Sequence, residues 1–433
     1  MMVSVKNTAL FAAVFGLILL TGFTSGWNSA LLILNMGLIS AIMAIGVNLQ
    51  WGFAGLFNIG VMGFLALGGL AAVLVSEPVT PGAWSAGGFQ VIAALLMGFA
   101  TIALTIFVRG KTTGRVRTIV TPLLLIVGFF IYRAIFDPAV ARIEAIDPAV
   151  SGNIGGLNLP ILFAWPVGGV FAAAAAWVIG KTALGLRSDY LAIATLGISE
   201  IVIAVMKNED WLARGVKNVI GIERPVPSEI ELQESAQFVE RAASLNIDPV
   251  TASTLYVKLS YSVLFVIVLL LIFLAAELAL KSPWGRMMRA IRDNETAARA
   301  MGKDVTARHL QIFVLGSAIC GVAGAMMVTL DGQLTPSSYQ PLRFTFLIWV
   351  MVIVGGSGNN YGSVLGGFLI WFLWVQVEPY GAALMGFITD PMPDAWWIKE
   401  RLLASVAHMR LLTMGLILLL VLRFFPRGLI PEK

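Results

Sequence analysis

Long uncharged stretches dominate the chain and alternate with short polar segments. Asn7–Ser76 contains no Lys, Arg, Asp or Glu, and it is far longer than the ~20 residues that one helix needs to cross a bilayer. Because backbone N–H and C=O groups in lipid must bond within their own segment, such stretches are predicted to be helices. Further uncharged runs are Pro78–Val108, Pro148–Gly180, Leu259–Ala276, Leu310–Leu330 and Phe344–Val377.

The pattern predicts an all-α fold, a polytopic transmembrane bundle of about 10–12 helices in a single domain over residues 1–433. The apolar runs are too continuous for the alternating strands of an outer-membrane barrel. Two expected spans are atypical: 54–75 is rich in glycine, which favours a broken or re-entrant helix, and 343–355 is short. The expected spans are 9–25, 30–49, 54–75, 88–108, 118–136, 160–180, 190–206, 255–279, 309–330, 343–355, 361–378 and 406–425.

Composition narrows the class of protein. Hydrophobic residues make up 58% of the chain and charged residues 12%, which excludes a soluble globular, a disordered and a fibrous protein. The single cysteine, Cys320, excludes an internal disulfide, and only two histidines, His309 and His408, argue against a Cys/His metal site. Lys6 precedes the first apolar run without a small-x-small cleavage site after it, so an uncleaved first helix is expected rather than a signal peptide.

Charges in the loops predict the orientation, since Lys and Arg gather in short cytoplasmic loops. The 207–253 segment has eight acidic and five basic residues and is expected to face outward. Twelve alternating spans then place both termini in the cytoplasm, and the net charge of +5 reflects topology rather than nucleic-acid binding. The basic regions expected in the cytoplasm are 109–117, 181–187, 281–308 and the tail with Arg427 and Lys433.

The external 207–253 segment is the first of two large polar segments. Within it, Glu229–Ala243 places apolar side chains among charged ones and is predicted to form a short surface helix. Two interpretations stay open, a solvated cap on the outer face and a docking surface for an external partner.

The second polar segment, 281–308, predicts two short helices. The first begins near Arg286, and the second covers Glu295–Met301, capped by Asp293 or Asn294 and ended by Gly302. Closely spaced alanines give the second helix a smooth surface that another protein can approach. The residues alone leave open whether this helix binds a protein or lies on lipid headgroups.

Several motifs resemble those of one transporter family. Arg289–Gly302 matches the pattern R-A-I-R-x-N-E-x-A-A-x-A-M-G, which is similar to the ATPase-coupling loop of branched-chain amino acid ABC importer permeases, the LivM-like family. Other motifs that resemble this family are Gly52–Gly60, Leu186–Leu196, Val354–Gly362 and Phe425–Leu429. The resemblance touches most of the chain, although the regions 109–158 and 207–253 look longer than is usual for the family.

The resemblance implies a permease subunit of an ATP-driven importer in the bacterial inner membrane. The expected partners are a second permease subunit that forms a heterodimer, two cytoplasmic ABC ATPases, a periplasmic solute-binding protein and the lipid bilayer, with no nucleic acid. This chain is expected to hold no cofactor, because ATP and Mg belong to the ATPases and no phosphate-loop motif is present. Branched-chain amino acids are the implied solutes, with urea and short amides as the alternative cargo.

The resemblance also assigns residues to two sites. Unwound backbone can bind a polar solute through its N–H and C=O groups, so a translocation path is expected near the glycine-rich segment, although close packing explains each glycine as well. Residues of the possible path are Gly52, Gly55, Asn58, Gly60, Tyr190, Thr195 and Glu200. Residues of the ATPase-coupling site are Arg289, Arg292, Asp293, Asn294, Glu295, Ala297, Ala298, Met301 and Gly302.

Ionisable residues at membrane depth each require an explanation. Glu200 lies within an apolar helix and is expected to pair inside the bundle rather than to contact solute, whereas Glu277 is expected to reach water.

An ion-coupled secondary transporter would need more such residues and no docking loop. A membrane-embedded transferase would need clustered His, Asp or Cys, so no enzyme activity is expected of this chain.

Overall fold

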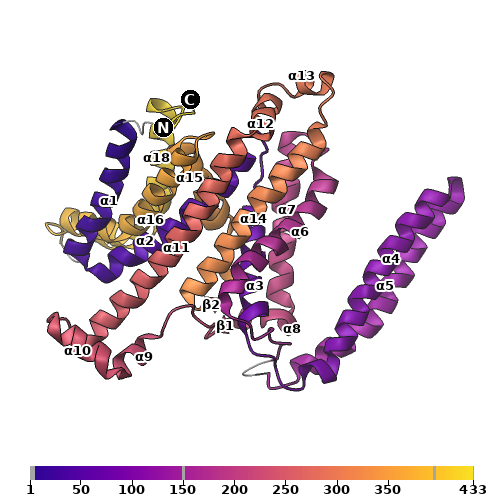
Figure 1. The fold of residues 1–433 in the computed structure, drawn as a ribbon, viewed down its shortest axis with the longest axis horizontal. Helices are drawn as coiled ribbons and strands as arrows, with labels where there is room; N and C mark the ends of the chain where they lie inside the picture. Colours follow the sequence, from indigo (N-terminus) through magenta and orange to yellow (C-terminus); the bar gives the residue numbers. More distant parts are fainter. Residues whose placement is uncertain (1–4, 149–151, 394–395, 433) are drawn as a thin grey trace.

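The fold is described by a computed structural model over residues 5–148, 152–393 and 396–432 (Figure 1). Within these ranges ten helical runs are long and apolar enough to cross a membrane, and two shorter apolar helices join them. These segments follow the twelve expected spans in order, so the polytopic all-α fold is confirmed. The long runs are α1 (Val5–Ser25), α2 (Trp27–Gln50), η1–α4 (Trp84–Lys111), α5 (Gly114–Glu144), η2–α6 (Ile161–Ala183), α7 (Ser188–Asn208), α11 (Pro249–Lys281), α14 (Val305–Asp331), α16 (Asn360–Thr389) and α17–η6–α18 (Trp397–Phe424).

The two atypical spans are the two short helices. The expected span 54–75 becomes helical only at α3 (Val61–Ser76), because residues 51–60 form a turn and an extended stretch. The expected span 343–355 is the run η5–α15 (Leu342–Gly355). Helices α3 and α15 (Leu347–Gly355) are almost wholly buried inside the protein, where neighbouring side chains can satisfy backbone groups that lipid could not.

Glycine contacts bring α3, α6 and α14 into direct backbone contact. A Cβ atom built on Gly68 of α3 would lie 1.9 Å from the Gly321 carbonyl oxygen of α14, and one on Gly321 would lie 2.3 Å from that of Gly168 in α6. One on Gly324 would lie 2.0 Å from the Leu65 carbonyl oxygen. Helices can approach this closely in a membrane only where small residues face one another, so these glycines serve packing.

Helix α2 joins this group to a second one formed by α11, α15 and α16. A Cβ on Gly46 of α2 would lie 2.7 Å from the Gly316 carbonyl oxygen of α14, and one on Gly367 of α16 would lie 2.7 Å from Ala41 Cα. Nearly every residue of α2 from Asn35 to Gln50 is buried. Helix α2 is therefore the centre of the bundle.

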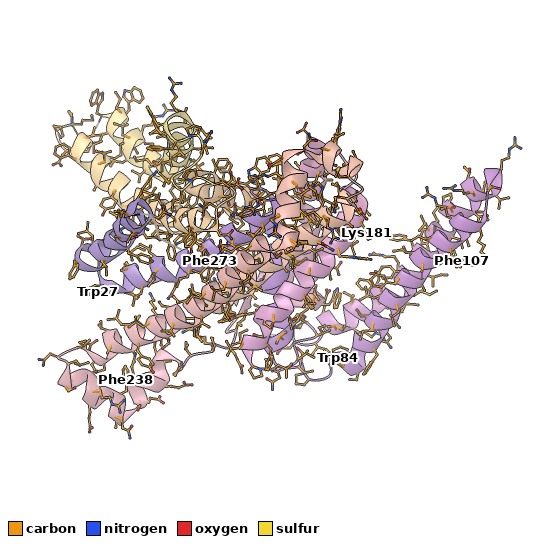
Figure 2. All side chains as sticks on the ribbon, turned by 45° about the horizontal axis from the view of Figure 1, so that its top comes forward. Trp27, Trp84, Phe107, Lys181, Phe238 and Phe273 are labelled. Carbon is orange, nitrogen blue, oxygen red and sulfur yellow. The ribbon has the colours of Figure 1, made fainter. Side chains whose placement is uncertain are left out.

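Helices α4 and α5 form a long hairpin that stands apart from the bundle (Figures 1 and 2). A separate small core packs the base of the hairpin against α8 (Asp210–Ala213), with Phe136 and Trp211 in edge-to-face contact at 5.8 Å. Beyond this base most side chains of the hairpin are exposed and apolar, as expected for helices that face the lipid of a bilayer. Helix α5 and the turn that precedes it belong to the 109–158 region, of which residues 149–151 lie outside the described ranges.

The loops are sorted by charge between the two ends of the molecule. The end called here the basic end carries the 109–117, 181–187 and 281–308 loops, and the two ends of the described chain lie there as well (Figure 1). The opposite, acidic end carries the 207–253 segment. Successive loops therefore lie at alternate ends of the molecule, as the loop charges predict, and both ends of the described chain lie on one side. Lys433 of the basic tail lies outside the described residues.

The polar segments themselves contain short elements. At the acidic end lie η3 (Gly215–Lys217), α9 (Glu229–Glu234), α10 (Ala236–Ser244), η4 (Pro336–Ser338) and a two-stranded antiparallel ladder. The ladder pairs β1 (Val219–Ile220) with β2 (Gln333–Leu334), in the register Val219 with Leu334. The single helix expected at Glu229–Ala243 is wrong, because the extended backbone of Ser235 divides it into α9 and α10.

The glycine packing predicts a large difference between two otherwise similar substitutions. Gly68→Ala should lower the thermal unfolding midpoint of the purified protein in detergent, because its methyl group forces α3 and α14 apart at a cost of about 1–3 kcal/mol. Gly415→Ala is the matched control in α18, where a Cβ meets nothing within 4 Å, and it should leave the midpoint unchanged or raise it. Equal effects of the two substitutions would contradict the assignment.

Candidate functional site

Residues 51–60 form an unwound segment between α2 and α3, close to the basic end. Close approach of other chain segments requires glycine at two of its positions: a Cβ on Gly52 would lie 2.3 Å from the Gly358 nitrogen, and one on Gly60 would lie 2.4 Å from the Thr195 carbonyl oxygen. Gly55 has a φ of 69°, in the region that favours glycine. The three glycines of this segment are therefore fixed by sterics and backbone conformation.

Side chains from several helices satisfy the backbone of the unwound segment. Thr195 Oγ1 of α7 accepts from the Ile59 nitrogen at 3.2 Å, and Ser199 Oγ donates to the Gly60 carbonyl oxygen at 2.7 Å. Trp349 Nε1 of α15 donates to the Asn58 carbonyl oxygen at 3.0 Å. These bonds replace the helical ladder that the segment lacks, so the segment is held in place by α7 and α15.

Buried amide side chains complete the support from within. Asn58 Nδ2 donates to Gln50 Oε1 at 2.8 Å, while Gln50 Nε2 donates to the Phe313 carbonyl oxygen at 2.8 Å and to Ser317 Oγ at 3.0 Å. Asn58 Oδ1 accepts from the Gly60 nitrogen at 2.8 Å. Each of these amides is at most 1% exposed, and a buried amide is stable only when it is bonded in this way. The network therefore ties the unwound segment to α14.

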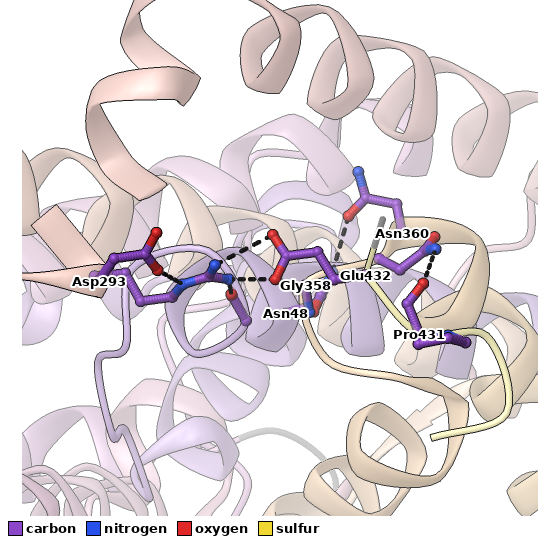
Figure 3. Close-up of polar contacts among 9 residues, drawn as sticks. Asn48, Asp293, Gly358, Asn360, Pro431 and Glu432 are labelled. Atoms are coloured by element: carbon purple, nitrogen blue, oxygen red, sulfur yellow. Dashed lines mark hydrogen bonds and ion pairs between the residues drawn. The ribbon is translucent and has the colours of Figure 1, made fainter. Parts of the chain in front are cut away.

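A second polar chain crosses from α2 to α11 through α16, and Figure 3 shows the part from Asn48 to Asn360. Asn48 Nδ2 donates to Asn360 Oδ1 at 3.0 Å, and Asn360 Nδ2 donates to Glu277 Oε1 at 3.1 Å. Asn48 Oδ1 accepts from the Gly358 nitrogen at 2.9 Å. Glu277 also pairs with Lys281 at 3.0 Å. Glu277 was expected to reach water; its side chain is only 17% exposed and serves chiefly as an acceptor inside this chain of bonds.

The 281–308 loop forms two helices at the basic end, α12 (Pro283–Asp293) and α13 (Glu295–Ala300). Met288 and Ile291 are at most 1% exposed and anchor α12 on the bundle. Pro283 begins α12 at its first turn, three residues before the expected start, because proline fixes a helical φ there.

Helix α13 has the cap and stop that its sequence predicts. Asn294 Oδ1 accepts from the Ala297 nitrogen at 2.9 Å and so caps the helix, whereas Asp293 does not. Gly302 has a φ of 76°, and the backbone bends away there. No residue of α13 is buried, and Met301, which follows it, is 79% exposed. Helix α13 thus projects from the protein with a free surface (Figure 1).

Arg292 joins the 281–308 loop to the bundle and to the tail, and Figure 3 labels two of its partners, Asp293 and Glu432. Its Nη1 and Nη2 donate to the two carboxylate oxygens of Glu432 at 2.8 and 3.2 Å, and its Nε donates to Asp293 at 3.1 Å. Nη1 also donates to the Gly52 carbonyl oxygen of the unwound segment. Burial alone lowers the pKa of Arg292, but the bonds to Glu432 and Asp293 outweigh it and raise the pKa above its ordinary value. The guanidinium is therefore a permanent cation.

A cavity of about 350 Å³ separates α13 from the unwound segment. Gly55 and Phe57 line it on one side and the 184–188 turn on another, with Glu295, Arg299 and His309 opposite. Glu295 and Arg299 pair at 2.7 Å along α13. The contacts of the coupling loop with the bundle are thus concentrated on α12 and Arg292, while α13 overhangs an open space.

The residues expected in the two sites are distributed as follows. Gly52, Asn58, Gly60 and Thr195 come together around the unwound segment, with Gly55 at its exposed bend. Tyr190 is 60% exposed, and Glu200 is exposed on the far face of α7. The expected pairing of Glu200 inside the bundle is wrong, because none of the described residues bonds to it.

In the coupling loop, Arg289 and Arg292 turn toward the chain itself. Arg289 donates to the Leu280 carbonyl oxygen at 3.5 Å. The free surface instead comprises Asp293, Asn294, Glu295, Ala297, Met301 and Gly302, with Ala298 half-buried. The sequence-based prediction missed Asn48, Gln50, Asn360 and Glu432. Amide side chains within otherwise apolar helices were a signal for the first three, whereas nothing in the sequence singled out Glu432.

Comparison with known proteins gives a consistent family. The sequence matches the profile described as "Branched-chain amino acid transport system / permease component" over residues 29–152 and 145–422. It is 27% identical over 295 residues to a probable branched-chain amino acid transport permease LivM of Methanocaldococcus jannaschii, covering 68% of this chain and 73% of that protein.

Two further relatives are the high-affinity branched-chain amino acid transport system permeases LivM of Escherichia coli and Salmonella typhimurium. Each is 30% identical over 210 residues, or 47% of this chain. The chain spans about half the length of these two relatives, 48% in each case. No solved structure matches the chain.

The Arg292–Glu432 contact predicts a measurable energetic coupling. A double-mutant cycle of Arg292→Ala and Glu432→Gln, measured by thermal unfolding in detergent, should give an interaction energy of about 1 kcal/mol for a half-buried bidentate pair. The matched control is the more exposed Arg299–Glu295 pair, for which about 0.3–0.5 kcal/mol is expected. Additive effects at Arg292 and Glu432 would mean that the tail is not held by this contact.

Proposed function

The chain belongs to the branched-chain amino acid transport system permease family, and we propose that it is one membrane subunit of an ATP-driven importer. As a member of this family it is a multi-pass transport subunit rather than an enzyme. The observation that carries the proposal is α13, a capped and fully projecting helix that is tied to the bundle through α12 and Arg292.

The partners follow from this role. Two cytoplasmic ABC ATPases bind ATP and Mg and hydrolyse the nucleotide, and each receives a coupling helix such as α13. A second, related permease completes the membrane part. An external solute-binding protein delivers cargo to the acidic end, where the 207–253 segment offers a broad polar surface.

The charges support the cellular orientation. Lys and Arg in short loops stay in the cytoplasm, so the basic end with α12, α13 and both ends of the chain faces the cytoplasm of a bacterial inner membrane. The acidic 207–253 segment then faces outward. This places α13 on the side where ATP is available.

The contacts suggest how motion reaches the membrane. When the ATPases close, they displace α13, and α12 moves with it because only Asn294 separates the two helices. Arg292 on the last turn of α12 transmits this displacement to the Gly52 carbonyl and so to the unwound segment. Thr195 and Ser199 pass it on to α7. Alternating access then results from movement of α7 and the unwound segment relative to α14.

Branched-chain amino acids are the proposed cargo, because the named relatives are permeases for these solutes. Urea or a short amide is the second candidate, since the 109–158 and 207–253 regions look longer than is usual for the family. An ion-coupled transporter does not need a helix that docks on an ATPase, so the projecting helix α13 favours the ATP-driven mechanism.

Uptake of labelled leucine, isoleucine, valine and urea tests the proposal in cells with and without this gene, each with and without ATP depletion. We expect loss of ATP-dependent uptake of the three amino acids in the deletion strain. Loss of urea uptake alone would change the cargo and keep the ATP-driven machine. Uptake that follows the ion gradient and ignores ATP would contradict the proposal.

The same assay tests the role of α13. Ala297→Glu should abolish uptake by placing charge and bulk on the free surface of α13, while the amount of protein in the membrane stays unchanged. Gly110→Glu is the matched control, because Gly110 is exposed at the same end and a Cβ there meets nothing within 4 Å. Normal uptake with Ala297→Glu would count against a coupling role for α13.

A further inference from the structure

Helix α7 has two faces of different character. One face holds the unwound segment through Thr195 and Ser199. The other face contacts little else in the described chain: Ile193 and Ile201 are 68% and 62% exposed, and Gly197, Glu200 and Ala204 are exposed as well. The spacing 193, 197, 200 and 204 places these residues in one stripe along the helix.

Glu200 makes this stripe unsuitable for lipid. It lies eight residues before the end of α7, or about 12 Å along the helix axis, which is too far for its short side chain to reach the membrane surface. No described residue bonds to its carboxylate. The other ionisable residues of α7, Asp189, Tyr190 and Lys207, lie near its ends. An ionisable group at this depth requires a polar partner, and this chain supplies none within the described ranges.

Gly197 leaves space beside Glu200 on the same face of α7. Glycine weakens a helix interior, and many membrane glycines of this protein are explained by another backbone within 3 Å, as at Gly68 and Gly324. A Cβ on Gly197 would meet nothing within 4 Å, so no packing inside the chain accounts for it. One turn from Glu200, it leaves room for a helix of another molecule to approach closely.

We propose that the α7 face formed by Ile193, Gly197, Glu200, Ile201 and Ala204 is the surface on which the second permease subunit docks, and that Glu200 accepts a hydrogen bond or ion pair from a basic or amide side chain of that subunit. The inference rests on the proposed function. It specifies a non-identical subunit, because an isologous contact uses the same patch on both copies, and this face of α7 holds no basic or amide side chain that could pair with Glu200.

The docking face also lies directly behind the unwound segment. A helix that packs on Gly197 and Glu200 is separated from Gly60 only by the width of α7. Movement of α7 during transport therefore changes this subunit contact and the unwound segment together, which gives the two membrane subunits a shared moving element.

Photo-crosslinking in intact membranes tests the contact, with the whole transporter expressed from its own genes. A benzophenone amino acid replaces Ile193 or Ile201 in turn, and Leu271 of α11 and Ile126 of α5 serve as controls of similar exposure. We expect adducts from 193 and 201 that contain this chain and a second, non-identical permease, identified by mass spectrometry, and none from the controls. An adduct of two copies of this chain, or no protein adduct, would overturn the proposal.

Substitution of Glu200 tests the polar pairing. Glu200→Leu suits lipid and should insert normally, yet we expect about tenfold or greater loss of co-purifying second permease, as one charged hydrogen bond is removed. Glu200→Gln keeps an acceptor and should retain most of the complex. Unchanged co-purification with Glu200→Leu would overturn the pairing. If wild-type cells show ATP-dependent uptake but the α7 adducts are absent, the proposed subunit contact is wrong and the proposed function stands. If wild-type cells show no ATP-dependent uptake, the proposed function itself is wrong.

Discussion

The bonds of Arg292 connect parts of the protein that are far apart in the sequence. One guanidinium reaches the unwound segment at Gly52 and the tail at Glu432 while it remains on the helix that leads to α13. A planar group with several donors in fixed directions can satisfy these acceptors together, which the single ammonium of lysine cannot do with the same geometry. The position of the coupling loop relative to the membrane helices therefore depends on this residue.

The membrane imposes the second constraint. A break in a helix exposes backbone groups that lipid cannot satisfy. The break at residues 51–60 exists because hydroxyl groups of α7, the Trp349 indole of α15 and the buried amides of Gln50 and Asn58, which are bonded to α14, surround it. Gln50 and Asn58 are buried without penalty because each is bonded. The unwound segment is thus bonded to its neighbours along its length, so any displacement of the segment acts through these bonds, and its exposed bend at Gly55 borders the adjoining cavity.

The apolar pattern predicts most of the fold, because in a bilayer length and hydrophobicity alone decide where a helix runs. The two atypical spans, 54–75 and 343–355, correspond to the two short buried helices. The cap at Asn294 and the stop at Gly302 were also predictable, since both depend on neighbouring residues only. The breaks at Ser235 and before Val61 were harder to locate, as they depend on contacts with other elements.

The partners of the polar side chains could not be predicted. Glu432 lies 140 residues from Arg292, and Asn360 lies 312 residues from Asn48, so no local pattern relates them. The resemblance of the Arg289–Gly302 motif predicts an ATPase contact for Arg292, but it does not show that the side chain turns inward. Glu200 illustrates the converse case: its apolar surroundings in sequence suggest a bundle partner, and only the packing of α7 shows that its face is open.

We propose that Arg292 transmits motion from α13 to the unwound segment. The number of solute molecules transported per ATP hydrolysed tests this role, in proteoliposomes that contain the complete transporter with the wild-type chain or with Arg292→Ala. We expect an assembled complex that still hydrolyses ATP while transport per ATP falls by about tenfold or more, as expected for loss of a charged hydrogen bond in the coupled step. An unchanged ratio would contradict it, since the coupling loop would then act on the membrane helices without this contact.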